Sequence, residues 1–573
     1  MIDKKDHLLE ILRHSAAHLT AQALLELYPD TQLTIGPATK TGFFYDFQSA
    51  TSLKESDLER ISERMSILAE QAIPFTHEQM DKKEARELYK KNPFKLELID
   101  NLPGETVGIA RQGDFYDLCR GGHVQSTAEL KHFILTGLSG SYWRADREQA
   151  RLQRISGVIF PTSKELRLYV KKIQDAEQYD HRKLGKEMNL FSFHQEGAGF
   201  PFYHAKGTAI FNGLKDYMRT IWKRHDYQEI ITPAMLDADL WKRSGHYNHY
   251  KDNMYFCAVE DRDYAIKPMN CPGAILTFKE RPHSFRDLPL RLSEFGHVHR
   301  FELSGVLHGL FRVRAFTIDD SHTFCTPEQL ESEILNSINI IDHTFKKFNF
   351  SDVSYAVSTR PEKSMGSAEL WEIATDALKS TLTKAGKEYR LLEGEGAFYG
   401  PKIEVTIKDS MDREWQCSTV QIDFFQPQNF DISYVASGGE KKQPVMIHQA
   451  VFGSLERFLG IIIEHLKGHM PFWLSPIQVK VLPITSEHSE YAASVVKELE
   501  NSGVRVELDE NQEPLSAKIK SAQLERIPWM LVIGDKEVEQ KTVTLRHASG
   551  KQEFGITVED IVKRAQELNS ESK

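Results

Sequence analysis

The fold is decided by a stretch that reads KPMNCPG (267–273), EFGHVHRFE (294–302), LHGLFRVR (307–314) and DDSHTFC (319–325). Charged side chains, a thiol and several imidazoles stand there among Phe, Leu and Val. This mixture is typical of a buried polar site, because polar groups inside a protein need polar partners within apolar walls. We therefore expect a functional site within this stretch.

Three residues are candidates for a zinc site: Cys271, His322 and the later His448. A catalytic zinc takes three nitrogen or sulfur ligands from the protein and keeps a fourth position open. Distance along the sequence cannot select these three from 5 Cys and 23 His. The alternative, a buried thiol and two hydrogen-bonded histidines, therefore remains open on spacing alone.

Arginines in and after this stretch are candidates for binding phosphate. Arg300 and Glu302 alternate along one predicted strand, and Arg312 and Arg314 alternate along a predicted returning strand, so each pair points to one face. A guanidinium group can clamp a phosphate or carboxylate at two points. Arg457, near the start of a later predicted helix, could reach the same cleft. The alternative is a solvated ladder of charges.

A second group of candidates lies near the N-terminus. His14 and His18 are four residues apart on a helix predicted over 7–27, so both imidazoles point the same way. Cys119 and His123 follow a predicted strand that runs into a glycine turn over 114–123. Such a pair of pairs indicates zinc or a hydrolytic site, whereas one histidine pair alone is usually structural.

The totals describe a large globular chain of several domains. At 573 residues it is too long for one core, and we expect three or four domains. The net charge of −10 is a weak argument against a nucleic-acid partner, since a basic groove can coexist with an acidic remainder. Five scattered cysteines indicate a reducing compartment. The first fifteen residues lack an apolar signal core, and no apolar run spans a bilayer, so we expect a cytoplasmic protein.

Periodicity predicts an α+β multidomain fold. A charged helical connector is expected over 166–186, and a solvent-facing amphipathic helix over 54–72. From about residue 191 we expect a large antiparallel sheet with flanking helices, including strands at 402–408 and 415–425 and a strand that becomes a helix over 445–465. After Pro476, strands and helices alternate as in a compact α/β domain of about a hundred residues.

These motifs resemble those of the bacterial threonyl-tRNA synthetases, a class II aminoacyl-tRNA synthetase family. The resemblance covers KPMNCPG, Arg300-x-Glu302, LHGLFRVR, GEGAFYGPK (394–402), WQCSTVQ (415–421) and VMIH (445–448) through to Arg457. It runs from about His7 to the C-terminus, and motifs of this length are highly specific.

The resemblance implies a domain organisation. It implies an N-terminal α+β editing domain at 1–175, a helical linker at 176–195, a class II antiparallel-sheet catalytic domain with zinc at 196–472, and a C-terminal α/β anticodon-binding domain at 476–573. Pro233 would end the first class II motif in the interface of a homodimer. The usual N-terminal ubiquitin-like domain would be absent, since His14 lies almost at the start.

The resemblance also implies an activity, threonine–tRNA ligation with ATP, through threonyl-adenylate and transfer to tRNA(Thr). One zinc per subunit, held by Cys271, His322 and His448, would bind the amino and hydroxyl groups of threonine, and Mg²⁺ would neutralise the triphosphate. Arg300 would hold the α-phosphate and Arg457 the γ-phosphate, with Glu302 near the adenine. The implied catalytic residues are Arg300, Glu302, Arg312 and Arg457, and the implied substrate-binding residues are Asp320, Tyr399, Lys402, Gln416 and Gln421.

A second, hydrolytic site is expected from selectivity. Valine lacks the hydroxyl that would complete the zinc coordination, but serine has one, and the loss of a methyl contact discriminates only about 10- to 200-fold. In the family, mischarged seryl-tRNA is hydrolysed in the editing domain without a bound metal. The matching residues here are His14, His18, Tyr45, Lys95, Asp117, Cys119 and His123. Glu537 and Arg546 would contact anticodon bases.

Three residues depart from the family pattern: Gly122, Ile318 and Gln449. Ile318 and Gln449 replace the glutamine and arginine that are usual beside the active site. A non-ligating, RNA-binding regulatory relative is the main alternative, although such proteins typically lose the arginines or metal ligands that this chain keeps. A purely hydrolytic tRNA deacylase would not need residues 191–466.

Overall fold

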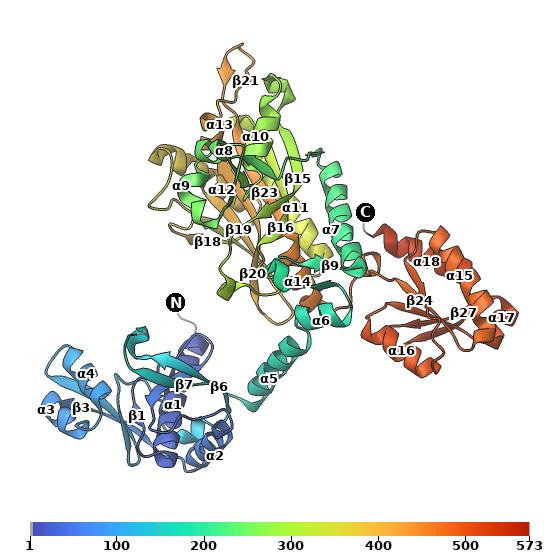
Figure 1. Cartoon of the computed structure of the whole chain (residues 1–573). Helices are drawn as coiled ribbons and strands as arrows, with labels where there is room; N and C mark the ends of the chain where they lie inside the picture. The colour runs from blue at the N-terminus through green and yellow to red at the C-terminus, as the bar shows by residue number, and fades with distance from the viewer. Residues whose placement is uncertain (1–3, 147, 572–573) are drawn as a thin grey trace. The chain divides into compact units, whose positions relative to one another are not determined.

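The computed structural model describes residues 4–146 and 148–571. It divides into two compact units, Met1–Gln174 and Asp175–Lys573, and each is described by itself. Figure 1 shows mixed helices and strands in both, as the α+β expectation requires. No helix in the described ranges combines the length and the hydrophobicity needed to cross a membrane.

The first unit is built around the long helix α1 (Lys4–Leu27). This helix packs on the antiparallel sheet β1 (Gln32–Leu33), β2 (Phe43–Gln48), β7 (Arg151–Ile159) and β6 (Phe133–Tyr142), in that order. The helix α2 (Asp57–Glu70) was expected to face solvent, and this expectation was only partly right. Its exposed face is charged, but Ile61, Met65 and Leu68 are buried in the same core as α1, because an amphipathic helix needs a surface to cover.

A second, smaller sheet completes the first unit. Its strands are β3 (Phe75–Asp81), β4 (Thr106–Gln112) and β5 (Phe115–Leu118), and the helices α3 (Lys82–Leu88) and α4 (Pro93–Asn101) accompany them. After β5 the chain turns at Gly121 and Gly122, whose φ angles are +100° and +84°. Only glycine adopts such angles without strain, and the turn directs His123 back toward α1.

The predicted connector is two helices rather than one. The helix α5 (Ser163–Gln178) ends before Asp180, and α6 (His181–Glu187) begins just after it. The Asp180 carboxylate accepts the backbone N–H of Arg182 at 2.8 Å, which caps the N-terminus of α6.

An eight-stranded sheet organises the second unit, as the antiparallel expectation required. Neighbouring strands are antiparallel except for the parallel pairs at the two edges. The order is β10 (Gln228–Glu229), β15 (Leu290–His299), β16 (Ala315–Cys325), β23 (Val445–Ser454), β20 (Glu414–Asp423), β19 (Lys402–Lys408), β17 (Val353–Ser358) and β18 (Tyr389–Leu392).

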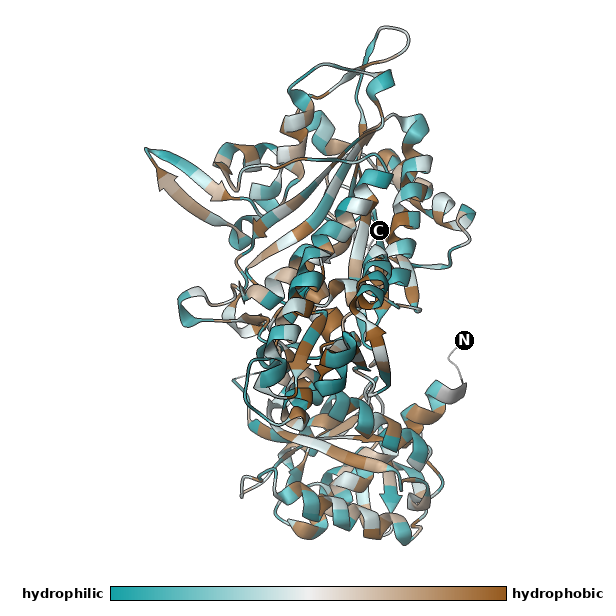
Figure 2. Cartoon of the chain, turned by 90° about the vertical axis from the view of Figure 1, so that its right-hand side faces the viewer, coloured by the Kyte–Doolittle hydropathy of each residue, from teal (hydrophilic) through white to brown (hydrophobic). Residues whose placement is uncertain are grey.

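Helices cover one face of this sheet and form the main core with it. They are α7 (Ala205–Arg224), α11 (Leu330–Lys347), α12 (Ala368–Lys384) and α14 (Leu455–His465). Along the strands, buried Ile447, Ile422 and Ile403 face these helices. The side chains between them therefore point to the opposite face. Figure 2 shows hydrophobic and hydrophilic segments next to one another along both strands and helices, as elements with one buried face require.

Smaller elements surround the sheet. They are the strand groups β11 (Met235–Asp237), β13 (Arg262–Ile266) and β12 (Tyr255–Val259); β14 (His283–Ser284), β21 (Tyr434–Val435) and β22 (Lys441–Lys442); and β8 (Phe191–Ser192) with β9 (Phe202–Tyr203). The helices are α8 (Ala238–Arg243), α9 (His246–Tyr250), α10 (Cys271–Lys279) and α13 (Phe425–Asn429).

The C-terminal part has a five-stranded sheet. Its order is β25 (Val506–Leu508), β24 (Val479–Pro483), β26 (Trp529–Ile533), β27 (Thr542–His547) and β28 (Gln552–Thr557), with helices α15 (Ser489–Asn501), α16 (Leu515–Leu524), α17 (Asp535–Gln540) and α18 (Val558–Ser570). The first three strands are parallel, which confirms the predicted alternation of strands and helices. The last two are antiparallel, and the sequence pattern missed them.

Candidate functional site

Four polar residues form one row across the large sheet. His322 on β16 lies opposite His448 on β23, and His448 lies opposite Gln421 on β20. Gln421 in turn lies opposite Lys402 on β19. The row occupies the face away from the helices, so sheet register alone gathers residues that are far apart in the sequence.

Other predicted substrate residues lie beside this row. Asp320 is two residues from His322 on the same face, and Asn270 donates to its carboxylate at 3.0 Å. The Tyr399 ring lies 5.4 Å from the His448 ring, centre to centre. Gln421 donates to the carbonyl oxygen of Gly400 at 3.0 Å. Gln416, in contrast, is exposed and donates to Thr419 on its own strand at 3.4 Å.

The predicted zinc ligands lie in one region without converging on a point. The His322 and His448 rings are 5.0 Å apart, centre to centre. His448 Nε2 lies 3.0 Å from the Asp423 carboxylate, and the Cys271 thiol accepts from Gln426 at 3.6 Å. Within the described ranges, two other groups bring three or more potential ligands within 4.8 Å of one another, and this set does not.

The chemistry of these residues nevertheless fits a metal. His322 Nε2 is buried and has no hydrogen-bond partner, since the nearest carboxylate oxygen, on Asp320, is 3.7 Å away, and this is costly unless something binds it. Cys271 is 2% exposed, and burial raises the pKa of its thiol well above the usual value. One sulfur and two imidazoles are ligands that zinc prefers. A metal would require Cys271 and His448 to exchange Gln426 and Asp423 for the ion.

The predicted phosphate residues stand on the loop between two strands, so their expected strand positions were wrong. β15 ends at His299, and β16 begins at Ala315. Arg300 donates to the carbonyl oxygen of Pro268 at 3.3 Å, and Arg312 forms an ion pair with Glu302 at 3.0 Å. One backbone bond, Arg300 N–H to Arg314 O at 2.8 Å, continues the register of β15 and β16. Beyond it the loop turns back on itself, with the Arg312 N–H donating to His308 O at 3.3 Å.

Arg457 has the least satisfied guanidinium of this group. Its Nε is buried without a hydrogen-bond partner, and the guanidinium lies 5.6 Å from the centre of the Trp415 ring. The ring holds the cation from one side while its N–H groups remain available for an anion.

One family departure is explained by position. Gln449 points to the core face of β23, where its side-chain oxygen accepts from Tyr227 at 3.0 Å and from Ser337 at 3.2 Å. It therefore faces away from the polar row and does not line the site.

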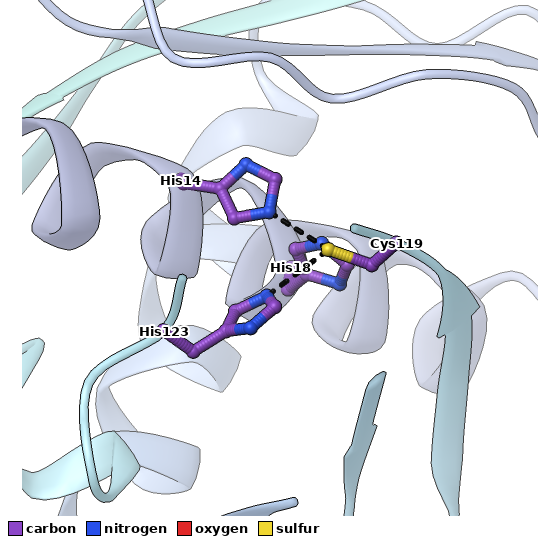
Figure 3. A group of neighbouring side chains, drawn as sticks. All are labelled: His14, His18, Cys119 and His123. Carbon is purple, nitrogen blue, oxygen red and sulfur yellow. Dashed lines mark hydrogen bonds between the residues drawn. The ribbon is translucent and has the colours of Figure 1, made fainter. Parts of the chain in front are cut away.

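The N-terminal candidates converge fully (Figure 3). His14 Nε2 lies 3.0 Å from the Cys119 sulfur, and His123 Nε2 lies 3.6 Å from it. The ligand atoms of His14, His18, Cys119 and His123 all lie within 4.8 Å of one another. Helix α1 supplies the first two side chains, and the glycine turn after β5 returns the last.

A buried ion pair between Asp117 and Lys95 lies next to this group. Asp117 pairs with Lys95, accepts the Tyr45 hydroxyl at 2.5 Å and lies 3.7 Å from His18. All three supporting side chains are at most 3% exposed. A cavity of about 430 Å³ opens beside them, and its lining includes His14, His18, Lys95, Asp117 and Cys119 with apolar Ile35, Pro37, Leu98 and Leu102.

Burial keeps this cluster uncharged at neutral pH apart from the ion pair. Burial, with the neighbouring imidazoles His14 and His77, lowers the pKa of His123 to about 4. Burial also raises the pKa of Cys119 to about 11. Neutral imidazoles can accept a proton from water, whereas a protonated thiol is a poor nucleophile.

The two predicted anticodon residues differ in availability. Both oxygens of Glu537 are used locally, since they accept from the Gly534 N–H at 3.0 Å and from Thr544 at 2.7 Å. Arg546, on β27, has a buried Nε without a partner. Phe554 on the neighbouring strand β28 is 73% exposed, and no motif in the sequence pointed to it.

Sequence reasoning also missed Asp423, Asn270 and Trp415. Asp423 stands two residues after Gln421 on one strand, so alternation could have placed it on the site face. Nothing in the sequence indicated that Trp415 would lie against Arg457.

Comparison with known proteins gives three family matches. Residues 255–466 match "tRNA synthetase class II core domain (G, H, P, S and T)", residues 478–568 match "Anticodon binding domain", and residues 107–156 match "Threonyl and Alanyl tRNA synthetase second additional domain".

Individual relatives agree over nearly the whole chain. The threonine–tRNA ligase of Acetivibrio thermocellus is 50% identical over 555 residues, covering 96% of this chain and 87% of the relative. The chain belongs to the threonine–tRNA ligase family. The ligase of Carboxydothermus hydrogenoformans is 47% identical, covering 97% of this chain and 89% of the relative.

A solved structure supports the family fold. The "RNA binding domain of Threonyl-tRNA synthetase" from Cryptosporidium parvum is 40% identical, with a TM-score of 0.66, and the match covers 68% of this chain and 98% of that structure. The class II core, the anticodon-binding domain and the additional domain expected of the ligase family are therefore present in the chain.

The lowered pKa of His123 predicts a stability that depends on pH. In the unfolded chain an ordinary histidine binds a proton near pH 6.5, whereas folded His123 does so near pH 4. Between these values the unfolded state holds more protons, so stability falls as pH falls. Hydrogen exchange of α1 amides, corrected for intrinsic rates, should therefore show less protection at pH 5 than at pH 7.

His123→Gln should make this dependence shallower, while His7→Gln, an exposed change on α1, should not. An α1 whose protection is the same at both pH values in the unchanged chain would contradict the prediction.

Proposed function

We propose that this ligase activates threonine with ATP to threonyl-adenylate and transfers the threonyl group to tRNA(Thr). The observation that carries the proposal is the row His322–His448–Gln421–Lys402 in a chain about half identical to threonine–tRNA ligases. We assign residues 1–175 to editing, 176–195 to a linker, 196–472 to catalysis and 476–573 to anticodon binding. ATP brings Mg²⁺, which neutralises triphosphate charge.

The protein's part in activation is positioning and charge stabilisation. Arg300 would hold the α-phosphate, because its guanidinium uses only Nε on Pro268. Arg457 would hold the γ-phosphate with its unpartnered nitrogen. Glu302 would lie near the adenine and orient Arg312, with which it is already paired.

Threonine would bind on the polar row. Cys271, His322 and His448 would hold a zinc ion, which supplies a Lewis acid for the amino and hydroxyl groups of threonine. Asp320, Tyr399, Lys402 and Gln421 would surround the amino acid, and the exposed Gln416 has the weakest support. Valine would leave the ligand set incomplete, since it has no hydroxyl.

Editing of seryl-tRNA would take place in the first unit. A neutral imidazole of His14, His18 or His123 would accept a proton from water as its oxygen attacks the ester carbonyl, and the ribose oxygen would leave with a proton. Lys95, Asp117 and Tyr45 would orient the ester, and the apolar part of the cavity fits a nucleoside. A bound metal is the second candidate, because four ligand atoms lie within 4.8 Å.

The partners beyond substrates are also proposals. Ile231 is 94% exposed two residues before Pro233, and Met235 and Val259 are each 47% exposed, which supports burial by a second copy. In the anticodon-binding part, Arg546 has a buried Nε without a hydrogen-bond partner, which a base contact would satisfy, whereas Glu537 would have to release the Gly534 N–H. Five free cysteines support a reducing, cytoplasmic location.

The zinc assignment predicts the effect of Cys271→Ser. The purified variant should lose most of its zinc, because serine is a poor zinc ligand, and threonine-dependent exchange of pyrophosphate into ATP should fall by about 100-fold or more. Metal analysis and the exchange assay measure both effects. Cys257→Ser, a more exposed thiol, is the matched control and should change neither.

Unchanged zinc stoichiometry in Cys271→Ser would refute the ligand assignment. An unchanged chain without threonine-dependent exchange would favour the RNA-binding, non-ligating alternative instead.

The editing assignment predicts that His14→Ala lets seryl-tRNA accumulate. Removing a proton acceptor of this kind typically costs about 100-fold or more in hydrolysis, while threonine ligation should stay within about twofold. Deacylation of purified seryl-tRNA(Thr) measures the loss, with exposed His7→Ala on the same helix as the control. Normal clearance of serine by His14→Ala would reject the assignment.

A further inference from the structure

The connector helix α6 begins with a fully buried imidazole that contacts two distant segments. His181 is 0% exposed. Its Nδ1 lies 2.6 Å from the Glu464 carboxylate on α14, and its backbone N–H donates to the same oxygen at 2.9 Å. Its Nε2 lies 2.9 Å from the backbone N–H of Leu310, in the loop between β15 and β16. A carboxylate only accepts and an N–H only donates, so Nδ1 carries the proton and Nε2 is the acceptor.

The loop is shaped to receive this ring. Gly309 has a φ angle of +48°, and a Cβ atom there would lie 2.2 Å from His181 Nε2. The ring of Phe311 lies 4.1 Å from the imidazole, centre to centre. The close approach therefore requires glycine at 309. Arg312 directly follows Phe311, so the contact of the Phe311 ring with His181 also helps to place Arg312.

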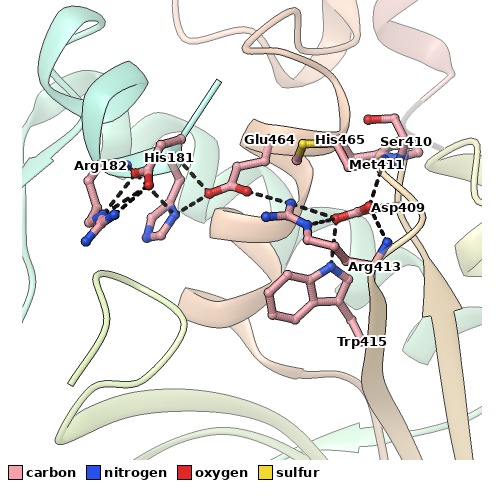
Figure 4. Close-up of polar contacts among 10 residues, drawn as sticks. His181, Arg182, Asp409, Ser410, Met411, Arg413, Trp415, Glu464 and His465 are labelled. Atoms are coloured by element: carbon pink, nitrogen blue, oxygen red, sulfur yellow. Dashed lines mark hydrogen bonds and ion pairs between the residues drawn. The ribbon is translucent and has the colours of Figure 1, made fainter. Parts of the chain in front are cut away.

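Charged side chains extend the contact from α14 to the turn between β19 and β20 (Figure 4). Glu464 pairs with Arg413 at 2.5 Å, and Arg413 pairs with Asp409 at 2.7 Å. Asp409 accepts the indole N–H of Trp415 at 2.8 Å. Although burial opposes ionisation, bonds from His181 and Arg413 hold the pKa of Glu464 below its ordinary value.

Trp415 connects this set of contacts to both arginine-bearing segments. Its ring lies 4.5 Å from that of Phe311 and 5.6 Å from the guanidinium of Arg457. One continuous set of contacts thus joins the start of α6 to Arg312 on the loop and to Arg457 on α14.

We propose that His181 is a positioning residue for ATP: it holds the 307–312 loop and α14 in one arrangement, so that Arg312 and Arg457 meet the same triphosphate. The proposal rests on the ATP roles assigned above to these two arginines. The sequence showed the segment only as a linker.

A metal at Asp180, His181 and Glu464 is a weaker interpretation, although their ligand atoms lie within 4.8 Å. Arg182 and Arg413 already neutralise the two carboxylates, and Leu310 occupies His181 Nε2. Zinc analysis of His181→Ala and Gly309→Ala, the two variants of the test that follows, decides between this interpretation and the positioning role.

A double-mutant cycle tests the proposal, with the KM for ATP in threonine-dependent pyrophosphate exchange as the measured quantity. Gly309→Ala should raise this KM by about tenfold or more in the unchanged background, because the new methyl group meets the imidazole and displaces the loop. In a His181→Ala background the same change should cost about threefold or less. Two effects are common to both backgrounds and cancel: the strain of alanine at positive φ, and the contact of the new methyl group with Arg182 Cγ, 2.9 Å away.

Further measurements separate positioning from a structural role. His181→Phe keeps a ring but removes both hydrogen bonds, and it should raise the KM for ATP while the KM for threonine and seryl-tRNA hydrolysis stay within about twofold. Lys183→Ala, an exposed change on α6, is the matched control. A purely structural residue would lower the thermal midpoint and the active fraction and leave the KM for ATP unchanged.

The outcomes distinguish this inference from the proposed function. An unchanged chain with threonine-dependent exchange, combined with additive effects of Gly309→Ala and His181→Ala on the KM for ATP, would overturn the positioning role alone. Zinc lost from His181→Ala but retained by Gly309→Ala would overturn it in favour of a metal at this cluster. An unchanged chain without exchange would refute the proposed function itself.

Discussion

The pairing register of β16, β23 and β20 is the constraint on which the rest of this structure depends. Side chains alternate between the faces of a sheet, so a slip of one residue would send every polar side chain of the row into the helix-covered core. The core prevents this slip, because Ile447 and Ile422 would then face the site. Apolar packing on one face thus determines the chemistry available on the other.

A buried carboxylate on β16 determines where the chain leaves β23 to begin α14. Asp319, on the core face of β16, accepts the backbone N–H groups of Val451, Phe452 and Gly453 at 2.8 to 3.1 Å. Gly453 has a φ of +74° there, and the chain leaves the sheet to begin α14. The position of Arg457 therefore follows from a buried carboxylate on the neighbouring strand. Together with the cluster around His181, it shows a site supported by polar groups behind the sheet.

Much of the fold could be predicted from the sequence because periodicity reports burial. The strand that becomes a helix over 445–465 and the parallel strands after Pro476 were confirmed. The same signal failed for Arg300 and Arg312, because their alternation runs past the ends of β15 and β16 into a loop that turns between His308 and Arg312. It also predicted that α2 faces solvent, whereas the apolar face of this helix is buried, because an amphipathic pattern does not say what covers the apolar face.

The sites were predictable where motifs are local and less so where contacts are distant. A helical turn brings His14 beside His18, and a glycine turn brings His123 beside Cys119. The contact between the two pairs spans 105 residues, so spacing predicted each pair but not how closely the pairs meet. Cys271 and His448 bond instead to Gln426 and Asp423, which spacing could not indicate. Their role as metal ligands remains a prediction. His181 was missed because a linker gives no sequence signal for contacts with a loop more than a hundred residues away.

X-ray absorption at the zinc edge of the purified protein tests the central claim most directly. The account predicts one sulfur at about 2.3 Å and two imidazole nitrogens at about 2.0 Å. It also predicts that Cys271→Ser loses most of the zinc and the sulfur signal with it, and that both persist in Cys119→Ser. A sulfur signal that instead disappears in Cys119→Ser, or a spectrum with no sulfur at all, would contradict the claim that the sheet register builds the metal site.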